Sequence, residues 1–565
     1  MQAIDSQGNP RPSPPSGRRP SKTGACQPQA APKLGGRRRD VAVSWAAAGA
    51  GGRDLGQIHN VQVTYSERGR DEPLYSGQYQ QPPLAPRDAV SGGDRDGMGE
   101  TAATDRDGSI ANVPTPDHRV HVPTKTGCFG GRSLTDPVFQ DLDPSSRSYL
   151  AHFTNRVCQD LVPRDSPNSN PFRELIPLTN KHPLLLYVLI ATSAIHWSNI
   201  SWTIPSIPIP TGLTNPGDYV AQLRSQDSGT RRALIDALTA KQKAIKHLRR
   251  AISSLDPAGN EVTLAAMHFF VKFELIDFER RVAIGNNPQE EREQGVTDWR
   301  AHLQAASRIL GLLASDSSGH ASSRMLRDCV IADCFIYHTL GSTLADTAGA
   351  SRITQYAFEL LHIMKRVEVN SYLSCPPEIL RIILFASQLS REDPCADCNP
   401  KAIDTALALI NEALAFDIAA WADQLRGLPN VTDIDSRIHV ASAHRSAVCL
   451  HILQALPPVR AVHGVDANFL VSDILSHLSQ IHDGDPYFKA TSWPTFIAGA
   501  ETRDGETRTW ILTRMLAIWH ICPWGYIFAA IRMLNVIWDM QSHGPGSAVN
   551  WLQKLKEGNL GYLIV

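Results

Sequence analysis

The sequence lacks an excess of charge of either sign. Its 565 residues include 55 Lys plus Arg and 56 Asp plus Glu, giving a formal net charge of -1. Whole-chain charge therefore gives no argument for a nucleic-acid or membrane partner, and any basic attraction has to be local. No apolar leader follows Met1, and the 10 cysteines have no recurring spacing. We expect a reducing compartment and no disulfide scaffold.

An uninterrupted membrane-length apolar run is also missing. The apolar stretch at residues 183–197 is interrupted by Thr192, Ser193 and His196. It falls short of the roughly 20 apolar residues that a membrane-spanning helix needs. The stretch predicts a buried core helix and no membrane partner.

Motifs for catalysis and nucleotide binding are lacking. There is no His-Glu-x-x-His, no Gly-x-Ser-x-Gly and no carboxylate pair that indicates chemistry. Residues 127–133 have the glycines of a phosphate-binding loop, but the loop is one residue short and has Arg132 in place of the lysine. Residues 49–54 lack the third glycine of a dinucleotide fingerprint. The sequence predicts no enzyme, no catalytic residue and no cofactor-binding residue.

The cysteine and histidine spacings do not define a metal site. Cys395 and Cys398 form the one Cys-x-x-Cys pair, and no second ligand pair accompanies them. We interpret them as loop cysteines. His444 and His451 share a helical stretch with Cys449, but two ligands two turns apart do not make a zinc site. These histidines are predicted to be core or surface residues, and no metal ligand is predicted.

Composition changes near residue 137. Residues 1–136 are dense in Pro, Gly, Ser, Arg and Asp and show no sustained apolar period. Such a segment buries too little apolar surface to offset its ordering entropy, so we predict disorder. For the basic clusters at residues 18–22 and 37–39 three interpretations stay open: a nuclear localisation signal, a contact to phosphate groups, or solvated charge without a partner.

Residues 137–565 show helical periods instead. Almost nothing alternates as a strand, so we predict an all-α, large, irregular domain of roughly ten or more helices. Ser145 or Ser146 is the expected cap of a first helix that starts at Pro144, and Ile245, Leu248, Ile252 and Leu255 form an apolar stripe. Further helices are predicted at residues 241–255, 262–278, 299–313, 324–344, 353–367, 403–424, 438–455, 469–481, 507–520 and 524–540.

Two separated segments carry a family resemblance. Residues 170–178 (Asn-Pro-Phe-Arg-Glu-Leu-Ile-Pro-Leu), continued by residues 182–196, resemble the start of the fungal-specific transcription factor domain. Residues 492–501 (Ser-Trp-Pro-Thr-Phe-Ile-Ala-Gly-Ala-Glu), continued by residues 522–525, resemble its C-terminal motif. The resemblance covers about residues 137–565. It implies a nuclear regulator of transcription, in a subgroup with many regulators of metabolic or biosynthetic genes.

A fragment upstream resembles the opening of the family's binuclear zinc cluster. Residues 125–129 (Lys-Thr-Gly-Cys-Phe) match it, but the family's cluster needs six cysteines, and Cys26 and Cys128 alone precede the helical body. Metal supplies the folding energy of such a module, so this chain cannot build it. Cys128 is either a remnant, from a deletion or a mispredicted exon junction, or an incidental loop residue. Zinc is expected only if a complete cluster is restored.

The predicted function is transcription regulation through the helical domain, with contacts to the transcription machinery or other regulators. Direct DNA binding is doubtful, and a homodimer through the body stays open. The alternative is a helical protein-interaction or small-effector-binding protein without DNA binding. Aromatic side chains crowd the last part of the chain, and we expect them in the core, with an apolar effector cavity as the alternative. They are Trp493, Phe496, Trp510, Trp519, Trp524, Tyr526, Phe528, Trp538 and Trp551.

Overall fold

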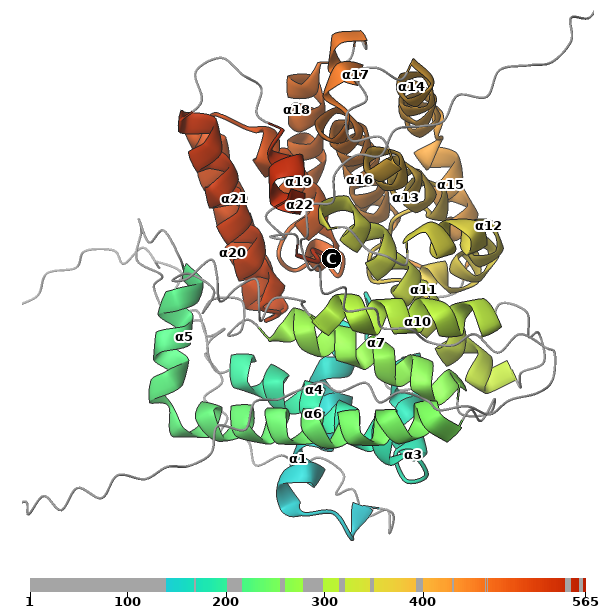
Figure 1. Ribbon diagram of the computed structural model, residues 1–565, viewed down its shortest axis with the longest axis vertical. Helices are drawn as coiled ribbons and strands as arrows, with labels where there is room; N and C mark the ends of the chain where they lie inside the picture. The colour runs from blue at the N-terminus through green and yellow to red at the C-terminus, as the bar shows by residue number, and fades with distance from the viewer. Residues whose placement is uncertain are drawn as a thin grey trace, which may run out of the picture. The chain divides into compact units, whose positions relative to one another are not determined.

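Helices form every regular element in the part of the chain that the computed structural model describes (Figure 1). The described residues are 139–166, 169–200, 216–254, 260–277, 298–313, 321–345, 350–392, 400–428, 431–462, 464, 466–543, 550–557 and 562–565. No strand occurs among them, which confirms the all-α prediction. The predicted disordered region at residues 1–136, Cys26, Cys128 and the Cys395–Cys398 pair lie outside the described residues.

The first group of helices leads from the start of the body to α12. In chain order these elements are α1 (Pro144–His152), η2 (Phe153–Val157), α2 (Cys158–Asp160), η3 (Pro171–Glu174), α3 (Leu175–Leu178), α4 (Pro183–Ile200), α5 (Pro216–Gln226), α6 (Ser228–Ser254), α7 (Asn260–Ile276), α10 (Asp298–Leu313), α11 (Ala321–Leu344) and α12 (Ala350–Val367).

The second group completes the body. Its elements are η6 (Glu368–Asn370), α13 (Pro377–Glu392), α14 (Pro400–Ala415), α15 (Ile418–Arg426), α16 (Ile434–Ala455), α17 (Pro457–Val462), α18 (Ala467–Ser479), η8 (Phe488–Thr491), α19 (Ser492–Glu501), α20 (Gly505–Ile521), α21 (Tyr526–His543) and α22 (Trp551–Glu557).

Two helices organise the packing, α4 in the first half and α16 in the second. α4 packs against α1, α6 and α7, and α7 in turn packs against α10 and α11. α16 packs against α13, α14, α18 and α19, and α19 continues to α20 and α21. In Figure 1 the green helices α6 and α7 lie beside α4, and the red helices near the C-terminus lie beside α16. One continuous apolar core runs through both halves, while Trp421 and its neighbours on α15 and α16 form a small separate cluster.

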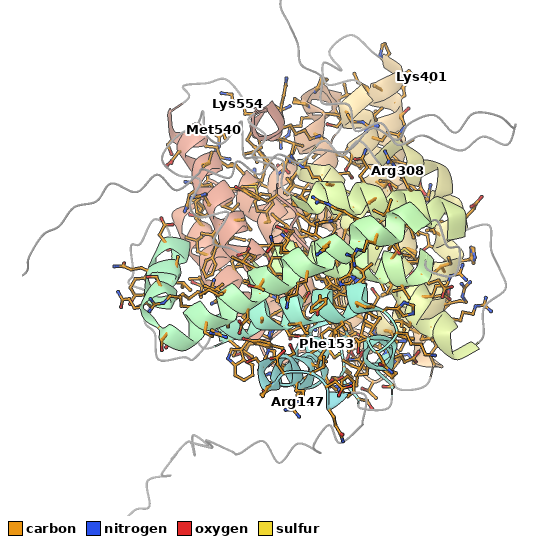
Figure 2. All side chains as sticks on the ribbon, turned by 60° about the horizontal axis from the view of Figure 1, so that its bottom comes forward. Arg147, Phe153, Arg308, Lys401, Met540 and Lys554 are labelled. Atoms are coloured by element: carbon orange, nitrogen blue, oxygen red, sulfur yellow. The ribbon has the colours of Figure 1, made fainter. Side chains whose placement is uncertain are left out.

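The side chains divide as the amphipathic pattern predicts. Phe153 is fully buried, whereas Lys401 and Lys554 are exposed at the periphery of the body (Figure 2). On α6, Leu248 is buried and Ile245 and Ile252 pack against the core, which confirms the predicted stripe as far as Ile252. Leu255 lies outside the described residues.

α4 is a core helix rather than a membrane span. By length and composition alone it could cross a membrane, since its 18 residues have a mean hydropathy of 1.3. However, 72% of it is buried inside the protein, against α1, α6 and α7. The predicted core helix is therefore confirmed, because its polar Thr192 and Ser193 are themselves inside the body.

Two local predictions were wrong. Asp143, not a serine, caps α1: its Oδ1 accepts from the Ser146 main-chain nitrogen at 2.9 Å, and Pro144 takes the first helical position. The helix predicted at residues 403–424 is two helices, because Asp417 adopts an extended conformation and caps α15 through the Ala420 nitrogen. The helices α5, α13, α17, α19 and α22 were not among the predicted ones.

Gly499 in the C-terminal motif allows α19 to approach its neighbours closely. A Cβ atom at this position would lie 2.9 Å from Ile511 Cγ2 on α20 and 3.1 Å from Leu534 Cδ2 on α21. The Gly499 carbonyl accepts a hydrogen bond from Trp538 Nε1 at 2.9 Å. The residue therefore has to be small because two helices pack directly against its backbone.

We expect Gly499→Ala to destabilise the protein by about 1–3 kcal/mol, because overpacking a filled site displaces its neighbours. Urea unfolding of the full chain followed by circular dichroism measures this change. Gly505→Ala is the matched control, since nothing lies within 4 Å of a Cβ there. Equal unfolding midpoints for both variants would contradict the packing argument.

Candidate functional site

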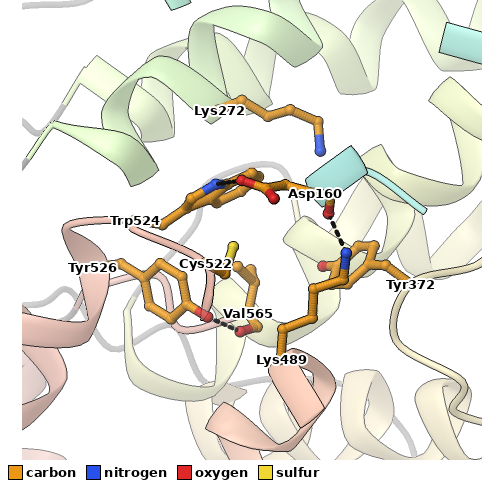
Figure 3. Close-up of a pocket in the computed structure, with 8 residues that line it drawn as sticks. All are labelled: Asp160, Lys272, Tyr372, Lys489, Cys522, Trp524, Tyr526 and Val565. Carbon is orange, nitrogen blue, oxygen red and sulfur yellow. Dashed lines mark hydrogen bonds between the residues drawn. The ribbon is translucent and has the colours of Figure 1, made fainter. Parts of the chain in front are cut away.

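Charged side chains gather in the interior where the two halves of the body meet. We call them the central charge cluster: Asp160 of α2, His196 of α4, Lys272 of α7, Asp333 of α11 and Lys489 of η8. Figure 3 shows Asp160, Lys272 and Lys489 around a small cavity. Each comes from a different helix, so the cluster exists only in the folded chain.

Asp160 is the acceptor that links the two halves. Its Oδ2 accepts from His196 Nε2 at 2.9 Å and from Trp524 Nε1 at 3.1 Å. His196 Nδ1 lies 2.9 Å from His152 Nε2, so the chain of polar contacts continues to α1. Trp524 belongs to the turn between α20 and α21. The carboxylate thus joins the beginning of the body to its C-terminal helices.

Asn199 and Lys489 reinforce this junction through main-chain carbonyls. Asn199 Nδ2 donates to Ile276 O at 3.0 Å and to Pro523 O at 2.8 Å. Lys489 Nζ donates to the carbonyls of Gln159, Asp160 and Val162 at 3.2, 2.8 and 2.8 Å. A cation at the last carbonyls of a helix is favourably placed, so Lys489 caps α2.

Lys272 and Asp333 form a buried ion pair within the cluster. Lys272 Nζ lies 3.2 Å from Asp333 Oδ2, and its side chain is 1% exposed. His268 Nε2 contacts the same carboxylate oxygen at 2.8 Å, and Tyr337 Oη accepts from Lys272. Aromatic rings surround the ammonium group, with the Trp524 ring centroid at 5.2 Å.

Burial and charge set the protonation states of the cluster. Burial opposes ionisation of Asp333, but the Lys272 charge and the His268 hydrogen bond outweigh it and hold its pKa below the usual value. Burial lowers the pKa of Lys272, against the attraction of Asp333. Burial and the nearby lysine lower the pKa of His268 to about 4. His268 is therefore neutral at pH 7, and the pair Lys272–Asp333 carries the charge.

Asp160 follows the same balance. Burial raises the pKa of Asp160. The hydrogen bond from His196 and the charge of Lys489 lower this pKa by a larger amount, so the net shift is downward. Burial in turn lowers the pKa of Lys489. The Lys489 charge thus acts on the Asp160 carboxylate without a direct ion pair, whereas Lys272 is paired directly with Asp333.

The cavity beside the cluster is small. It has a volume of about 20 Å³, enough for one water molecule. Tyr526 Oη donates to the Val565 main-chain oxygen at 2.6 Å on one side of it. Burial raises the pKa of the Cys522 thiol well above its usual value, which leaves it a thiol and a poor nucleophile. The arrangement holds helices together and leaves no room for a substrate.

The sequence-predicted residues fall elsewhere, in the core of the second half. His444 and His451 on α16 are 0% and 1% exposed and pack on Trp493, with ring centroids 6.0 and 6.2 Å away. Burial lowers their pKa values to about 4 and 3, so both are neutral core residues at pH 7. Cys449 is buried and free. No group of three His, Cys, Asp or Glu side chains suited to a metal occurs within the described ranges.

The aromatic residues near the C-terminus are core residues, as predicted. All but one are buried, and Trp510 packs half-buried against the same core. Trp524 and Tyr526 also line the small cavity. The sequence did not single out the central charge cluster, although the segments with family resemblance contribute His196 and Trp524 to it.

The fold and this junction define a helical body held together by buried charges, and comparison with known proteins identifies its class. The model of the fungal specific transcription factor domain matches residues 148–565, so the chain belongs to that family and is a fungal transcription regulator. The chain is similar to the acriflavine sensitivity control protein acr-2 of Neurospora crassa. The two are 35% identical over 448 residues, which is 76% of this chain and 69% of that protein. No solved structure matches the chain.

Proposed function

We propose that the chain regulates metabolic or biosynthetic genes in the nucleus through contacts of its helical body with other regulators or the transcription machinery, and that it has no catalytic role. The observation that carries this proposal is the family match, which spans residues 148–565 and so nearly all of the described body. The central charge cluster supports it, because the cluster joins distant helices and offers no substrate room. The name of the Neurospora relative adds genes that control sensitivity to acriflavine as a target class.

Tethering tests this proposal. The full chain is fused to an unrelated DNA-binding module and directed to a reporter promoter in a fungal host. We expect reporter output to change several-fold in either direction, since the body would supply the regulatory contacts. A matched fusion that carries Asp333→Asn serves as the control, because it destabilises the body through a buried residue and changes no surface side chain. Unchanged output from a fusion that is folded and nuclear would contradict the proposal.

We further propose that this chain reads no DNA sequence by itself. Cys128 is the one cysteine in the segment that resembles a zinc cluster, and two zinc ions in that module share six thiolates. We expect no preference between a CG-rich duplex and a scrambled duplex, even at about 50 mM salt, where phosphate contacts are strong. Fluorescence anisotropy with labelled duplexes measures this. A preference of tenfold or more would overturn the proposal.

The alternative origin of residues 125–129 has its own test. If the fragment results from a mispredicted exon junction, sequencing reads from messenger RNA across residues 127–132 will contain further codons for cysteine, arginine and lysine. Such an insertion would restore zinc binding and direct DNA contact. Reads that match the present sequence would leave protein contacts as the route to promoters.

A further inference from the structure

A cleft opens between α12, α13 and α15, away from the central charge cluster. Its volume is about 360 Å³, within the range of small-molecule sites. The three helices lie together at one side of the body in Figure 1. The lining residues are Lys365, Glu368, Glu378, Phe416, Asp417, Ala420, Trp421, Gln424, Leu425 and Leu428. The cleft is thus large enough for a compact organic molecule.

Carboxylates dominate the charge of the cleft. Glu368, Glu378 and Asp417 face a single lining lysine, Lys365, so three negative groups oppose one positive group. Lys365 Nζ is already paired with Glu378 Oε1 at 2.5 Å. Asp417 accepts from the Ala420 main-chain nitrogen at 2.9 Å. The electrostatic potential of the cleft therefore favours a cation.

Two carboxylate groups still have acceptor capacity for that cation. Glu368 is 8% exposed, and its Oε1 accepts from Trp421 Nε1 at 2.6 Å. Glu378 Oε2 is buried and has no hydrogen-bond partner among the residues that the structure describes. Such a buried acceptor without a partner is costly unless a ligand or water satisfies it.

Arg437 of α16 is the other charge near Glu368, and it points away from the cleft. Its guanidinium group donates to the main-chain carbonyls of Glu368 and Val369, at 3.5 and 3.1 Å. It also stacks over the Tyr487 ring at 4.7 Å. Arg437 therefore binds η6 through its main-chain carbonyls and does not line the cleft.

Apolar surface forms the other wall. Phe416 is half-buried, Trp421 is buried and Leu428 is 40% exposed at the rim. Aromatic faces attract cations, and they also stack on planar rings. We propose that this cleft binds a small organic cation with a flat apolar body, with Glu368 as the counter-ion and α15 as the covering element. The inference deepens the proposed function by naming the class of effector that the regulatory body would sense.

Binding at this place has a route into the rest of the body. α15 belongs to the small separate core of Ile418, Trp421, Leu425 and their neighbours rather than to the main core. The Trp421–Glu368 hydrogen bond connects α15 to η6. A ligand in the cleft meets residues of both elements and therefore changes how α15 is held against the body.

The protonation of Glu368 predicts a pH dependence. Burial, helped by the nearby Glu378 charge, outweighs the lowering by the Trp421 hydrogen bond, Arg437 and Lys365 and raises the pKa of Glu368 to about 7. A bound cation favours the ionised carboxylate, which the free protein already has above pH 7. Below pH 7 the proton must leave on binding, so affinity should fall by up to tenfold per pH unit.

Direct titration of the purified full-length chain tests the inference. The probe is N-methylquinolinium, a flat cation, and the uncharged comparison is quinoline at pH 7.5. We expect the cation to quench tryptophan fluorescence in a saturable way and to bind at least tenfold more tightly than quinoline. Glu368→Gln should weaken binding of the cation at least tenfold and leave binding of quinoline unchanged. It should also abolish the pH dependence of cation binding. Glu359→Gln, an exposed site on α12, is the matched control.

Leu428→Lys provides a second variant that leaves the buried residues intact. A lysine at this exposed rim position should repel the cation and weaken its binding at least tenfold. No saturable binding to the wild-type chain would overturn the inference, as would equal binding to wild type, Glu368→Gln and Leu428→Lys. Because the titration uses no promoter, its failure is distinct from failure of the tethering experiment.

Discussion

Asp333→Asn is expected to destabilise the protein by about 3–5 kcal/mol, because it leaves Lys272 buried without its counter-charge. Lys272 Nζ lies 3.2 Å from Asp333 Oδ2, and His268 Nε2 lies 2.8 Å from the same atom. Asparagine keeps the size of the side chain but removes the negative charge that balances the Lys272 ammonium group. Urea unfolding of the full chain at pH 7.5, followed by circular dichroism, measures the loss.

Two further variants decide whether the buried pair is the cause. Asp423→Asn removes a carboxylate that is 69% exposed and paired with Arg426, and we expect a change below about 0.5 kcal/mol. The double variant Lys272→Met/Asp333→Leu removes both charges and should recover most of the stability that Asp333→Asn loses. If Asp333→Asn unfolds at the same urea concentration as wild type, the central charge cluster does not hold the body together.

The helical fold was largely predictable because its signal is local. Apolar spacing along residues 262–278 and 438–455 indicates α7 and α16 within a few residues. The errors arose where a single polar side chain decides the local structure. Asp417 turns one predicted helix into α14 and α15, and Asp143 takes the cap that was assigned to a serine. The spacing of apolar residues reveals neither the helix break at Asp417 nor the choice of Asp143 as the cap.

The central charge cluster was not predictable in the same way, because its members are far apart in the sequence. Asp160 and Trp524 are 364 residues apart and meet only through tertiary packing. A weaker signal was present in the sequence. Lys272 and Asp333 each interrupt an apolar helical stretch, and a charge that is buried in such a helix requires a partner. The sequence could therefore have nominated the two residues, but not their pairing.

The cleft between α12, α13 and α15 gave no sequence signal at all. Glu368 and Trp421 occur in ordinary surroundings of mixed polarity, 53 residues apart. Trp421 lies on α15, which begins only after the break at Asp417. The misprediction that joined α14 and α15 therefore concealed the helix that forms one side of this cleft.

Trp493→Ala is the second substitution with a large expected effect. We expect it to lower the free energy of unfolding by about 3–5 kcal/mol, because it removes a fully buried indole from the core. Trp493 lies within the C-terminal family motif and packs on the rings of His444 and His451. Its Nε1 donates to Thr343 Oγ1 at 3.3 Å, which connects α19 to α11. Urea unfolding at pH 7.5 measures this loss.

Acid sensitivity distinguishes the packing role of Trp493 from a ligand role for the histidines. The pKa values of His444 and His451, about 4 and 3 in the folded protein, lie below the ordinary value of 6.5. The unfolded chain therefore takes up protons first as the pH falls below 6.5, and the folded protein loses stability from there toward pH 4. In Trp493→Ala, water that enters the cavity should raise both pKa values and make this loss shallower. Trp493→Phe, which keeps an aromatic ring, should retain the steep loss, and a steep loss in both variants would contradict the argument.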